Sequence, residues 1–392
     1  MTGKKAAVQD ARDAGERSMQ VEKQKRAAHE DTRALYEEVF CEDTPAFVEY
    51  YYQNCAAENQ IYTVSDQGKI LAMLHLNPYL MRLGEWQGEC NYIVAVATRK
   101  ECRHQGLMTR LIQVSVREMH EKKQPFAFLM PAAEAIYRPF GFRFIYSQRQ
   151  ARLKPADTGR MPQDFWLKKA QEEDLRALSA FAGQVLSPYR VIALHTEAYF
   201  SRLLKEQECQ DGEIMLIMRG KEICGYFFSS REEGLMVREA MIAPKQEAWL
   251  FPAVQEWAKN HQARLCFWPD WVKEQESLEG EKTVPLIMAR VMHLETLASC
   301  LRAREPISFE IEVEDDLIPQ NSGIYCLELG PGKGRAVRLQ SQGSPVWRTN
   351  AADFTRLAFG CLDLQEPGIS PKAAEALRQV IPLSPVMLNE IV

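Results

Sequence analysis

The sequence predicts an α/β fold of the α+β kind, divided into three domains. The chain has 392 residues, which is more than one hydrophobic core usually organises. Runs that alternate with a period of two, typical of strands, are interleaved with runs of helical period. A second block repeats the element order of the first after residues 151–163, where Pro155, Gly159 and Pro162 indicate a linker.

The first block follows a polar stretch, residues 1–18, which we interpret as a flexible tail. A helix is expected up to Phe40, and Thr44 followed by Pro45 predicts the start of another. The period then changes from helical to strand-like. The elements expected in the rest of the block are a hairpin at 60–64 and 70–76, strands at 85–97, 126–130 and 142–150, and helices at 103–122 and 132–138.

The second and third blocks mix helical and strand-like patterns in the same way. In the second block we expect helices at 172–185, 195–206 and 250–261, and strands at 212–219, 222–229, 234–243 and 263–268. In the third block we expect a helix or a strand and a helix at 288–301, strands at 307–313 and 323–329, and helices at 353–359 and 371–380. The predicted domains after the tail are residues 19–151, 152–284 and 285–392.

Composition narrows the function classes. The formal net charge is −5 and the pI is about 5.9, which argues against a nucleic-acid partner. No stretch is apolar enough for a membrane helix, and the N-terminus has no apolar segment typical of a signal peptide. The ten cysteines are dispersed and include no Cys-x-x-Cys pair. We therefore expect a cytoplasmic protein with reduced thiols and no metal site.

One window, residues 94–142, indicates chemistry. A strand-like run leads into Arg103-His104-Gln105-Gly106, and a helix follows. The backbone N–H groups at a helix start carry partial positive charge and bind anions such as a pyrophosphate. Gly106 lets the backbone approach such an anion closely, and Arg103 and His104 can add side-chain donors.

The turn alone does not identify its ligand. It is not a phosphate loop, since no Gly-Lys-Ser/Thr follows, and its glycine spacing differs from that of the dinucleotide fingerprint. Downstream, however, stands Ile136-Tyr137-Arg138-Pro139-Phe140-Gly141-Phe142. This order of a strand, a phosphate-binding helix, a strand and a short helix that ends in a tyrosine and a Gly-Phe turn resembles the GNAT acetyltransferases.

More closely, the chain resembles the Eis (enhanced intracellular survival) family of N-acetyltransferases. The residues that carry the resemblance are 96–98, 103–107, 136–142 and 288–291. That family has two GNAT-like domains followed by a domain that resembles sterol carrier proteins. The resemblance therefore implies tandem GNAT-like domains and a sterol-carrier-like α+β domain, which fits the order of the three blocks.

The resemblance also implies an acetyl-CoA-dependent N-acetyltransferase. Tyr137 is implied as the general acid that protonates the thiolate of coenzyme A, and the terminal carboxylate of Val392 as the base that takes a proton from the acceptor amine. Lys100 stands where such phosphate turns often carry proline. The residues implied in cofactor binding are Val96, Ala97, Thr98, Arg103, His104, Gln105, Gly106, Leu107, Met108, Thr109, Ala132 and Ala133.

For the acceptor, the resemblance implies a molecule with several amines, such as an aminoglycoside or a lysine side chain, and a homo-oligomeric enzyme, commonly a hexamer. Direct attack of the amine is expected, because no Cys or Ser stands in a nucleophile–base arrangement. Two alternatives stay open. One is a carrier of hydrophobic ligands with a vestigial transferase fold, and the other is an acyltransferase with a different acyl donor or acceptor.

Several other side chains have two interpretations. His75 and His120 are expected to pack and not to catalyse. Aromatic residues that either pack in the core, which we favour, or line an acceptor pocket are Phe40, Tyr50, Tyr51 and Trp86. Acidic residues that either attract a polycationic acceptor or form a solvated face are Glu37, Glu38, Asp43 and Glu390.

Overall fold

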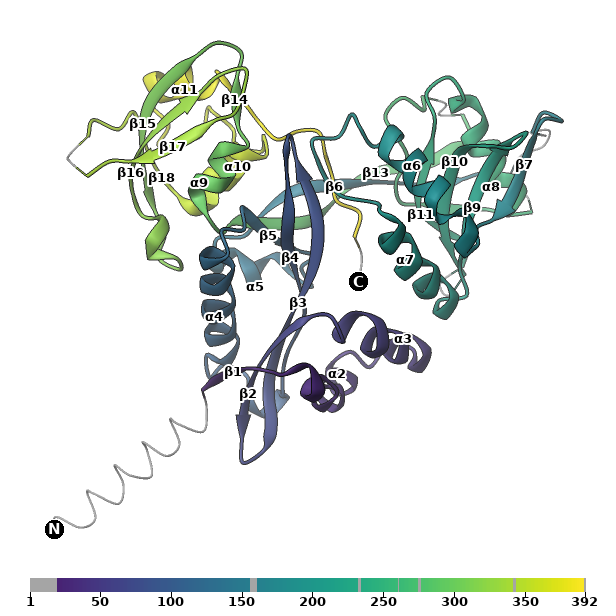
Figure 1. Ribbon diagram of the computed structural model, residues 1–392, viewed down its shortest axis with the longest axis horizontal. Helices are drawn as coiled ribbons and strands as arrows, with labels where there is room; N and C mark the ends of the chain where they lie inside the picture. Colours follow the sequence, from purple (N-terminus) through teal and green to yellow (C-terminus); the bar gives the residue numbers. More distant parts are fainter. Residues whose placement is uncertain are drawn as a thin grey trace.

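The computed structural model describes residues 20–155, 161–231, 234–259, 261–273, 276–340 and 343–390. Figure 1 shows three lobes, which we call the first, second and third units in chain order. Among the described residues, one sheet of 14 strands runs through the first and second units, and a four-stranded sheet lies in the third. This mixture of helices and twisted sheets confirms the predicted fold class. The predicted tail, residues 1–18, lies outside the described residues.

In the first unit, helices cover both faces of the sheet (Figure 1). Alternate residues of the strands face α4 on one side and the α2–α3 pair on the other, as the period of two requires. Its elements are β1 (Val21–Lys23), η1 (Arg26–Thr32), α2 (Arg33–Val39), α3 (Pro45–Tyr50), the π-helical turn η2 (Tyr51–Ala56), β2 (Gln60–Asp66), β3 (Lys69–Leu83), β4 (Trp86–Thr98), η3 (Lys100–Cys102), α4 (Leu107–Glu121), β5 (Phe126–Leu129), α5 (Glu134–Tyr137), η4 (Arg138–Phe140) and β6 (Arg143–Leu153).

The second unit has a similar order of strands and helices. Its strands β9 to β11 form antiparallel neighbours, and β11 pairs in parallel with β12. Its elements are β7 (Phe165–Lys169), η5 (Glu172–Asp174), α6 (Leu175–Val185), β8 (Val191–Ala193), α7 (Glu197–Cys209), β9 (Glu213–Arg219), β10 (Glu222–Ser230), β11 (Met236–Ile242), η6 (Glu247–Trp249), α8 (Leu250–Trp257), β12 (Ala263–Leu265) and β13 (Leu278–Val291).

The third unit packs its helices on the sheet β17-β16-β15-β18. The range 288–301, for which a helix alone was one interpretation, contains the end of a strand and a separate helix. The elements are α9 (Leu294–Ser299), β14 (Arg302–Ala303), β15 (Ile307–Glu314), η7 (Pro319–Asn321), β16 (Gly323–Leu329), β17 (Arg335–Arg338), β18 (Trp347–Asn350), α10 (Ala351–Ala358), α11 (Pro371–Leu377) and β19 (Val380–Ile381). The last strand, β20 (Val386–Met387), leaves this unit and joins the large sheet.

Two features of the sheet bring distant parts of the chain together. The long strands β6 and β13 pair with each other, and the end of β13 also pairs with β5, so the first two units share one sheet. The C-terminal strand β20 pairs with β8, which in turn pairs with β3. The last described residues therefore lie between the first and second units, beside α7 (Figure 1). Among the described residues, no helix has the length and apolar character needed to span a membrane.

Candidate active site

Strands β4 and β5 separate after a single paired position. They run in parallel and are joined where Tyr92 pairs with Phe128. Beyond that pair, β4 continues to Thr98 with β3 on its other edge, whereas β5 ends at Leu129. Within the described part of the chain, the edge of β4 that faces this opening is not closed by a strand. Its backbone N–H and C=O groups are therefore available to an extended ligand.

A β-bulge lies at this opening. The pairing of β3 with β4 skips from His75–Val94 to Met73–Ala97, so two residues of β4 oppose one residue of β3. Ala95 adopts a left-handed conformation with φ 50°, which is uncommon for a residue with a side chain. A bulge of this kind bends the strand and redirects its backbone groups. The backbone of Val96, Ala97 and Thr98 follows directly after it.

The predicted phosphate turn is exposed and ends in a helix start. His104 and Gly106 have φ of 62° and 76°. Gly106 is the N-cap of α4, and no side chain caps this helix. A Cβ at Gly106 would meet nothing within 4 Å, so space is open in front of the first N–H groups of α4. The first turn of a 15-residue helix thus presents free donors to an anion.

Tyr137 lies at the end of α5, which follows β5. Its side chain is 8% exposed and its ring packs edge-on against Phe142 at 6.1 Å. Burial raises the pKa of Tyr137 to about 12, so the hydroxyl carries its proton at neutral pH. Tyr92, at the single paired position of β4 and β5, accepts a hydrogen bond through its hydroxyl from the backbone N–H of Met130, the residue after β5, at 3.2 Å. Tyr137 therefore borders the opening between β4 and β5.

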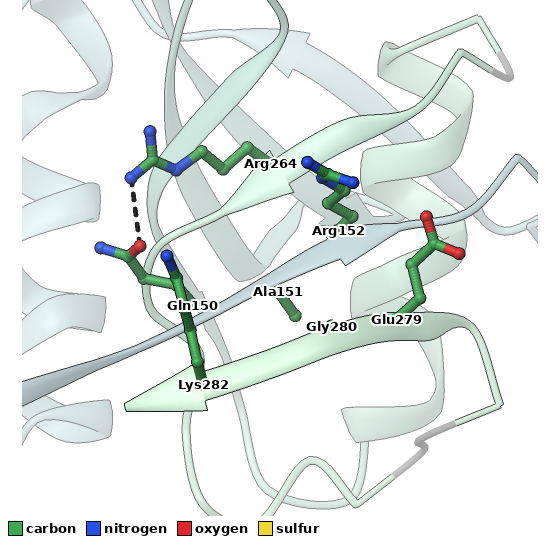
Figure 2. A pocket seen from close by; sticks show the side chains of 7 residues that line it. All are labelled: Gln150, Ala151, Arg152, Arg264, Glu279, Gly280 and Lys282. Atoms are coloured by element: carbon green, nitrogen blue, oxygen red, sulfur yellow. Dashed lines mark hydrogen bonds between the residues drawn. The ribbon is translucent and has the colours of Figure 1, made fainter. Parts of the chain in front are cut away.

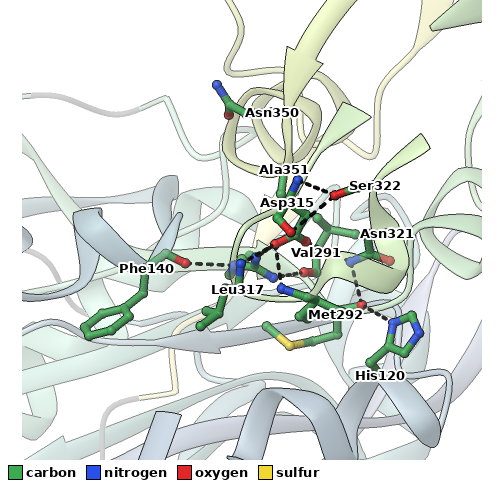
Figure 3. A network of polar contacts seen from close by, with 12 residues as sticks. His120, Phe140, Val291, Met292, Asp315, Leu317, Asn321, Ser322, Asn350 and Ala351 are labelled. Carbon is green, nitrogen blue, oxygen red and sulfur yellow. Dashed lines mark hydrogen bonds and ion pairs between the residues drawn. The ribbon is translucent and has the colours of Figure 1, made fainter. Parts of the chain in front are cut away.

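A buried ion pair holds the turn that follows Tyr137. Figure 3 shows the polar network around its carboxylate, Asp315. The guanidinium of Arg290 donates to the carbonyls of Phe140 and Val291 at 2.8 and 2.7 Å and pairs with the carboxylate of Asp315 in the third unit. Arg290 also lies against Gly141, where a Cβ would come within 3.1 Å of Nε. Glycine is required there for space and for its φ of 82°.

Asp315 is satisfied from several sides. It accepts hydrogen bonds from the backbone N–H groups of Leu317 and Ile318 at 3.1 and 2.8 Å and from the amide of Asn321 at 3.0 Å. Asn321 in turn donates to the carbonyl of Met292, which also contacts His120 (Figure 3). We call Arg290 and Asp315 the junction pair, because it joins the third unit to the Tyr137 turn.

A recess of about 330 Å³ lies between the first and second units. One wall is formed by Pro78, Tyr79 and Leu80 of β3, and the opposite wall by α7. Arg202 and Lys205, three residues apart on α7, supply two positive charges to the lining, and Glu58 supplies one negative charge. The remaining lining residues are Asn54, Leu194, Thr196, Ala198, Tyr199 and Ser201.

A smaller cavity of about 30 Å³ adjoins this recess, since Tyr79, Tyr199 and Arg202 line both. Glu390 of the C-terminal segment lines it and is 4% exposed. Burial, together with the charge of Glu239, raises the pKa of Glu390 to about 7, although His195 and Arg202 act against this shift. The Oε2 atom of Glu390 has no hydrogen-bond partner among the described residues.

The other charges around Glu390 are buried as well. His195 Nε2 lies 3.4 Å from Glu239 Oε1 but makes no hydrogen bond within the described part of the chain. Burial disfavours the charged imidazole, yet the carboxylate of Glu239 keeps the pKa of His195 above its usual value. Arg238 pairs with Glu206 at 2.5 Å. We call Glu390, His195, Glu239, Arg202, Arg238 and Glu206 the C-terminal cluster.

Buried amides anchor the segment that carries Glu390. Asn389 donates to the carbonyl of Arg238 at 2.8 Å and accepts from Gln148, which accepts from Gln150 at 2.8 Å. Gln150 accepts from Arg264 at 3.1 Å, as Figure 2 shows. Arg264 stands at a second recess, of about 650 Å³, on the face formed by β12, β6 and β13. This recess lies at the sheet face of the second unit, away from Tyr137.

The structure locates the predicted site residues as follows. Residues 96–98 and 103–109 follow one another from the end of β4 into α4, and Ala132, Ala133 and Tyr137 follow β5, so all border the same opening. Their roles remain predictions. Val392 lies outside the described residues. Tyr50 and Tyr51 are buried in the core, as favoured, and His75 packs against Tyr51 with its Nδ1 2.9 Å from the hydroxyl.

Sequence reasoning missed most of the C-terminal cluster. Glu390 had been assigned either to a solvated face or to acceptor attraction, and its burial shows that the solvated-face interpretation is wrong. His195, Arg202 and Glu239 carried no motif, since they belong to different elements of the second unit. The apolar residues that surround Glu390 at the end of the chain were the one available signal, because charged residues are seldom placed in such surroundings without a role.

Comparison with known families identifies two parts of the chain. Residues 20–145 match the family described as acetyltransferase (GNAT) domain. Residues 294–368 match the family described as sterol carrier protein domain. The first unit is therefore a GNAT acetyltransferase domain, and the third contains a sterol-carrier-like domain. No curated protein matches the sequence at a significant level.

Solved structures share the whole architecture. A GCN5-related N-acetyltransferase from Anabaena variabilis superimposes with a TM-score of 0.79 at 17% identity, covering 95% of this chain and 99% of that one. A probable N-acyltransferase from Enterococcus faecalis gives 0.78 at 15%, covering 93% and 97%. Eis1 from Mycobacterium abscessus gives 0.71 at 15%, covering 94% and 99%. These likenesses confirm the fold, and with the matching GNAT domain the prediction of a GNAT-type acetyltransferase enzyme is confirmed.

Proposed function

We propose that the chain is an acetyl-CoA-dependent N-acetyltransferase of the Eis type that transfers the acetyl group directly to an amine. The observation that carries the proposal is the opening between β4 and β5, which is followed by the uncapped start of α4 and bordered by Tyr137. An extended pantetheine arm and a pyrophosphate need such an edge and such a helix start in sequence. The three-part fold shared with Eis1 supports the family assignment.

For the donor, the backbone of Val96 and Thr98 would pair with the pantetheine amides, and the turn up to Thr109 would hold the pyrophosphate. Exposed Arg103 and His104 can reach phosphate oxygens from the rim of the turn. Ala132 and Ala133, exposed at the start of α5, can contribute backbone contacts only. Coenzyme A supplies an activated thioester when it is bound, and these residues position it.

For the transfer step, the acceptor amine attacks the thioester carbon and forms a tetrahedral oxyanion, which backbone N–H groups near Val96 would stabilise. The carbon–sulfur bond then breaks, and Tyr137 gives its proton to the departing thiolate. A pKa of about 12 keeps this hydroxyl protonated until the thiolate forms. The proton of the amine passes to a carboxylate of the C-terminal segment, for which we propose the terminal carboxylate of Val392.

For the acceptor, the family resemblance favours a molecule with several amines, such as an aminoglycoside or a lysine side chain, and a homo-oligomer as the active form. The recess beside Tyr79 is the natural entry for it, because the recess leads into the cavity at Glu390. A carrier of hydrophobic ligands is the second candidate, and the sterol-carrier-like domain at 294–368 favours it.

The test measures thiol release from acetyl-CoA with aminoglycosides, polyamines, amino acids and lysine peptides. We expect turnover with at least one class, reduced at least about tenfold in Tyr137→Phe. Tyr189→Phe, which removes the hydroxyl of a buried tyrosine in the second unit, is the matched control and should retain activity. Coenzyme A binding without turnover of any amine would redirect the proposal to another acyl donor or acceptor, and absence of binding would favour the carrier.

A second arm tests the terminal base. One or two glycines appended after Val392 displace the carboxylate from its place in the chain, and we expect the extended enzyme to lose most of its turnover while it still binds coenzyme A. Full activity in the extended enzyme would exclude the terminal carboxylate as the base.

A further inference from the structure

We propose that the acceptor is a zwitterion: besides the amine that is acetylated it carries an anionic group, a carboxylate above all, which Arg202 and Lys205 bind. An amino-acid-like molecule has this chemistry, whereas a pure polycation does not. The inference rests on the proposed function and specifies its substrate class. It follows from the unmatched charges of the recess and the adjoining cavity.

Arg202 is the first of these charges. It lines both the recess and the inner cavity. Its contacts are with neutral groups: Nη1 lies 3.5 Å from Asn77 Oδ1, and the guanidinium stands over the ring of Tyr79 at 4.9 Å. Among the described residues, no carboxylate lies within ion-pair distance of it. A half-buried guanidinium with several unused donors in a fixed plane is suited to a planar carboxylate.

The neighbouring arginine of the same cluster shows the contrast. Arg238 pairs with Glu206 at 2.5 Å, and Glu206 also accepts from the hydroxyl of Tyr50 at 3.5 Å. Glu206 lies on α7 itself, one turn after Arg202, but its carboxylate is already engaged with Arg238. Arg202 therefore has no ion-pair partner among the described residues. Because it lines the recess, a ligand bound there can supply the anion.

Lys205 adds a second positive charge one turn further along α7. Its ammonium donates to the side-chain oxygen of Asn54 at 3.2 Å, across the recess. The recess lining thus holds two cations against the single carboxylate of Glu58. Such a lining favours a molecule that carries an anion beside its amine over one that carries only positive charges.

The acceptor amine would have Glu390, in the inner cavity, as its partner. Glu390 lines the inner cavity with Arg202, and its buried Oε2 lacks a hydrogen-bond partner among the described residues. An acceptor that enters amine first would bring its ammonium to Glu390 and leave its anionic group at Arg202 and Lys205. Because Arg202 lines both spaces, the two groups would stand a short distance apart, as in an amino acid.

The experiment compares acceptors that differ only in the carboxylate. The pairs are lysine with cadaverine, phenylalanine with phenethylamine, and glutamate with 4-aminobutyrate, which lacks only the α-carboxylate. Thiol release gives kcat and KM for each member. We expect the member with the carboxylate next to the amine to have a kcat/KM at least about 30-fold higher in the wild type, carried mainly by KM.

Arg202→Gln should abolish this preference and Arg202→Glu should reverse it toward cadaverine, while affinity for acetyl-CoA stays unchanged. Arg202→Lys should retain part of it. Arg176→Gln removes an exposed charge of α6 and is the matched control. A wild type that prefers the decarboxylated members, or a preference that survives in Arg202→Gln, overturns the inference and leaves the proposed function standing. Coenzyme A binding without turnover of any acceptor overturns both.

Discussion

Two buried clusters of charge differ in how fully they are satisfied. In the junction pair, Arg290 and Asp315 face each other, and the remaining groups of both bind backbone or amide partners. In the C-terminal cluster, Glu390 Oε2 is buried and has no hydrogen-bond partner among the described residues, and His195 Nε2 has only the carboxylate of Glu239, at 3.4 Å. Buried polar groups are nearly always paired in proteins. The comparison indicates that the first cluster stabilises the structure, and it agrees with our proposal that the second binds a ligand.

The two clusters nevertheless serve one site. The junction pair holds the carbonyl of Phe140 and thereby the turn after Tyr137. The C-terminal cluster lies on the side of Tyr79, which lines the inner cavity with Glu390 and whose ring packs edge-on against Tyr92 at 6.1 Å. Tyr92 bridges the opening between β4 and β5. A satisfied cluster thus positions the proposed acid, and an unsatisfied one faces the proposed acceptor.

The largest effect is expected from breaking the junction pair. Asp315→Asn leaves the guanidinium of Arg290 buried without its counter-charge, so the free energy of unfolding should fall by about 3–5 kcal/mol. Chemical denaturation measures this loss. The adjacent, exposed Asp316→Asn is the control and should change stability little. A loss below about 1 kcal/mol for Asp315→Asn would show that the pair is not a structural anchor.

Glu390→Gln should raise the free energy of unfolding, in contrast to Asp315→Asn, because it removes an unfavourable buried charge. A carboxyl whose pKa is raised to about 7 in the folded chain binds its proton more tightly than the unfolded chain does. Wild-type stability should therefore fall as pH rises from about 4.5 through 7, whereas the glutamine variant avoids this fall. Between pH 5 and pH 8 the wild type should therefore lose up to about 3 kcal/mol of stability relative to the variant.

The groups that act on this titration and must be considered in its interpretation are His195, Glu239, Arg202, Tyr79, Tyr92, Tyr146 and Tyr199. Denaturation across the pH range compares Glu390→Gln with Glu375→Gln, an exposed position of α11. If the stability of wild type and of Glu390→Gln changed with pH in the same way, the pKa of Glu390 would not be raised in the folded protein. If the ligand inference is right, the same variant loses acceptor affinity while it gains stability.

Asn389→Ala tests the residue next to Glu390, whose side-chain amide is fully hydrogen-bonded. It removes the hydrogen bonds to Gln148 and to the carbonyl of Arg238 and leaves those buried groups without partners. We expect a loss of about 1–3 kcal/mol. Since the segment that carries Glu390 loosens, acceptor KM should rise more than the dissociation constant of acetyl-CoA. An equal rise in acceptor KM and in the acetyl-CoA dissociation constant would show that Asn389 supports the sheet as a whole and has no particular effect on acceptor binding.

The smallest effect on stability is expected at the predicted phosphate turn. There the cost of a substitution comes from backbone conformation and not from a buried charge. Gly106→Ala forces alanine into φ 76° and should cost about 1 kcal/mol. Gly220→Ala is the matched control, since its φ is 58° and its Cβ also meets nothing within 4 Å. Both should lose similar stability, but only Gly106→Ala should weaken acetyl-CoA binding. Equal affinity in the two variants would exclude a phosphate contact at this turn.

Residues adjacent in the sequence made the proposed acetyl-CoA side of the site predictable. The start of α4 at Gly106 and the turn after Tyr137 depend on residues that are adjacent in the sequence, and the structure has both. The hairpin turn at Gly68 and the helix start at Thr44, whose hydroxyl accepts from the N–H of Phe47 at 3.2 Å, are of the same kind. The role of Arg290 was not predictable, because its partners Phe140 and Asp315 are far away in sequence.

The sequence by itself determined the α/β class, the strand–turn–helix of the predicted phosphate turn, and the place of Tyr137 in the short helix after β5, because each follows from short-range periodicity and turn chemistry. Only the tertiary structure decided the acceptor side. Glu390, His195 and Arg202 meet because β20 pairs with β8 and β8 with β3, which draws the end of the chain between two units. No local pattern encodes that pairing, and a charged residue is by default exposed until a fold buries it.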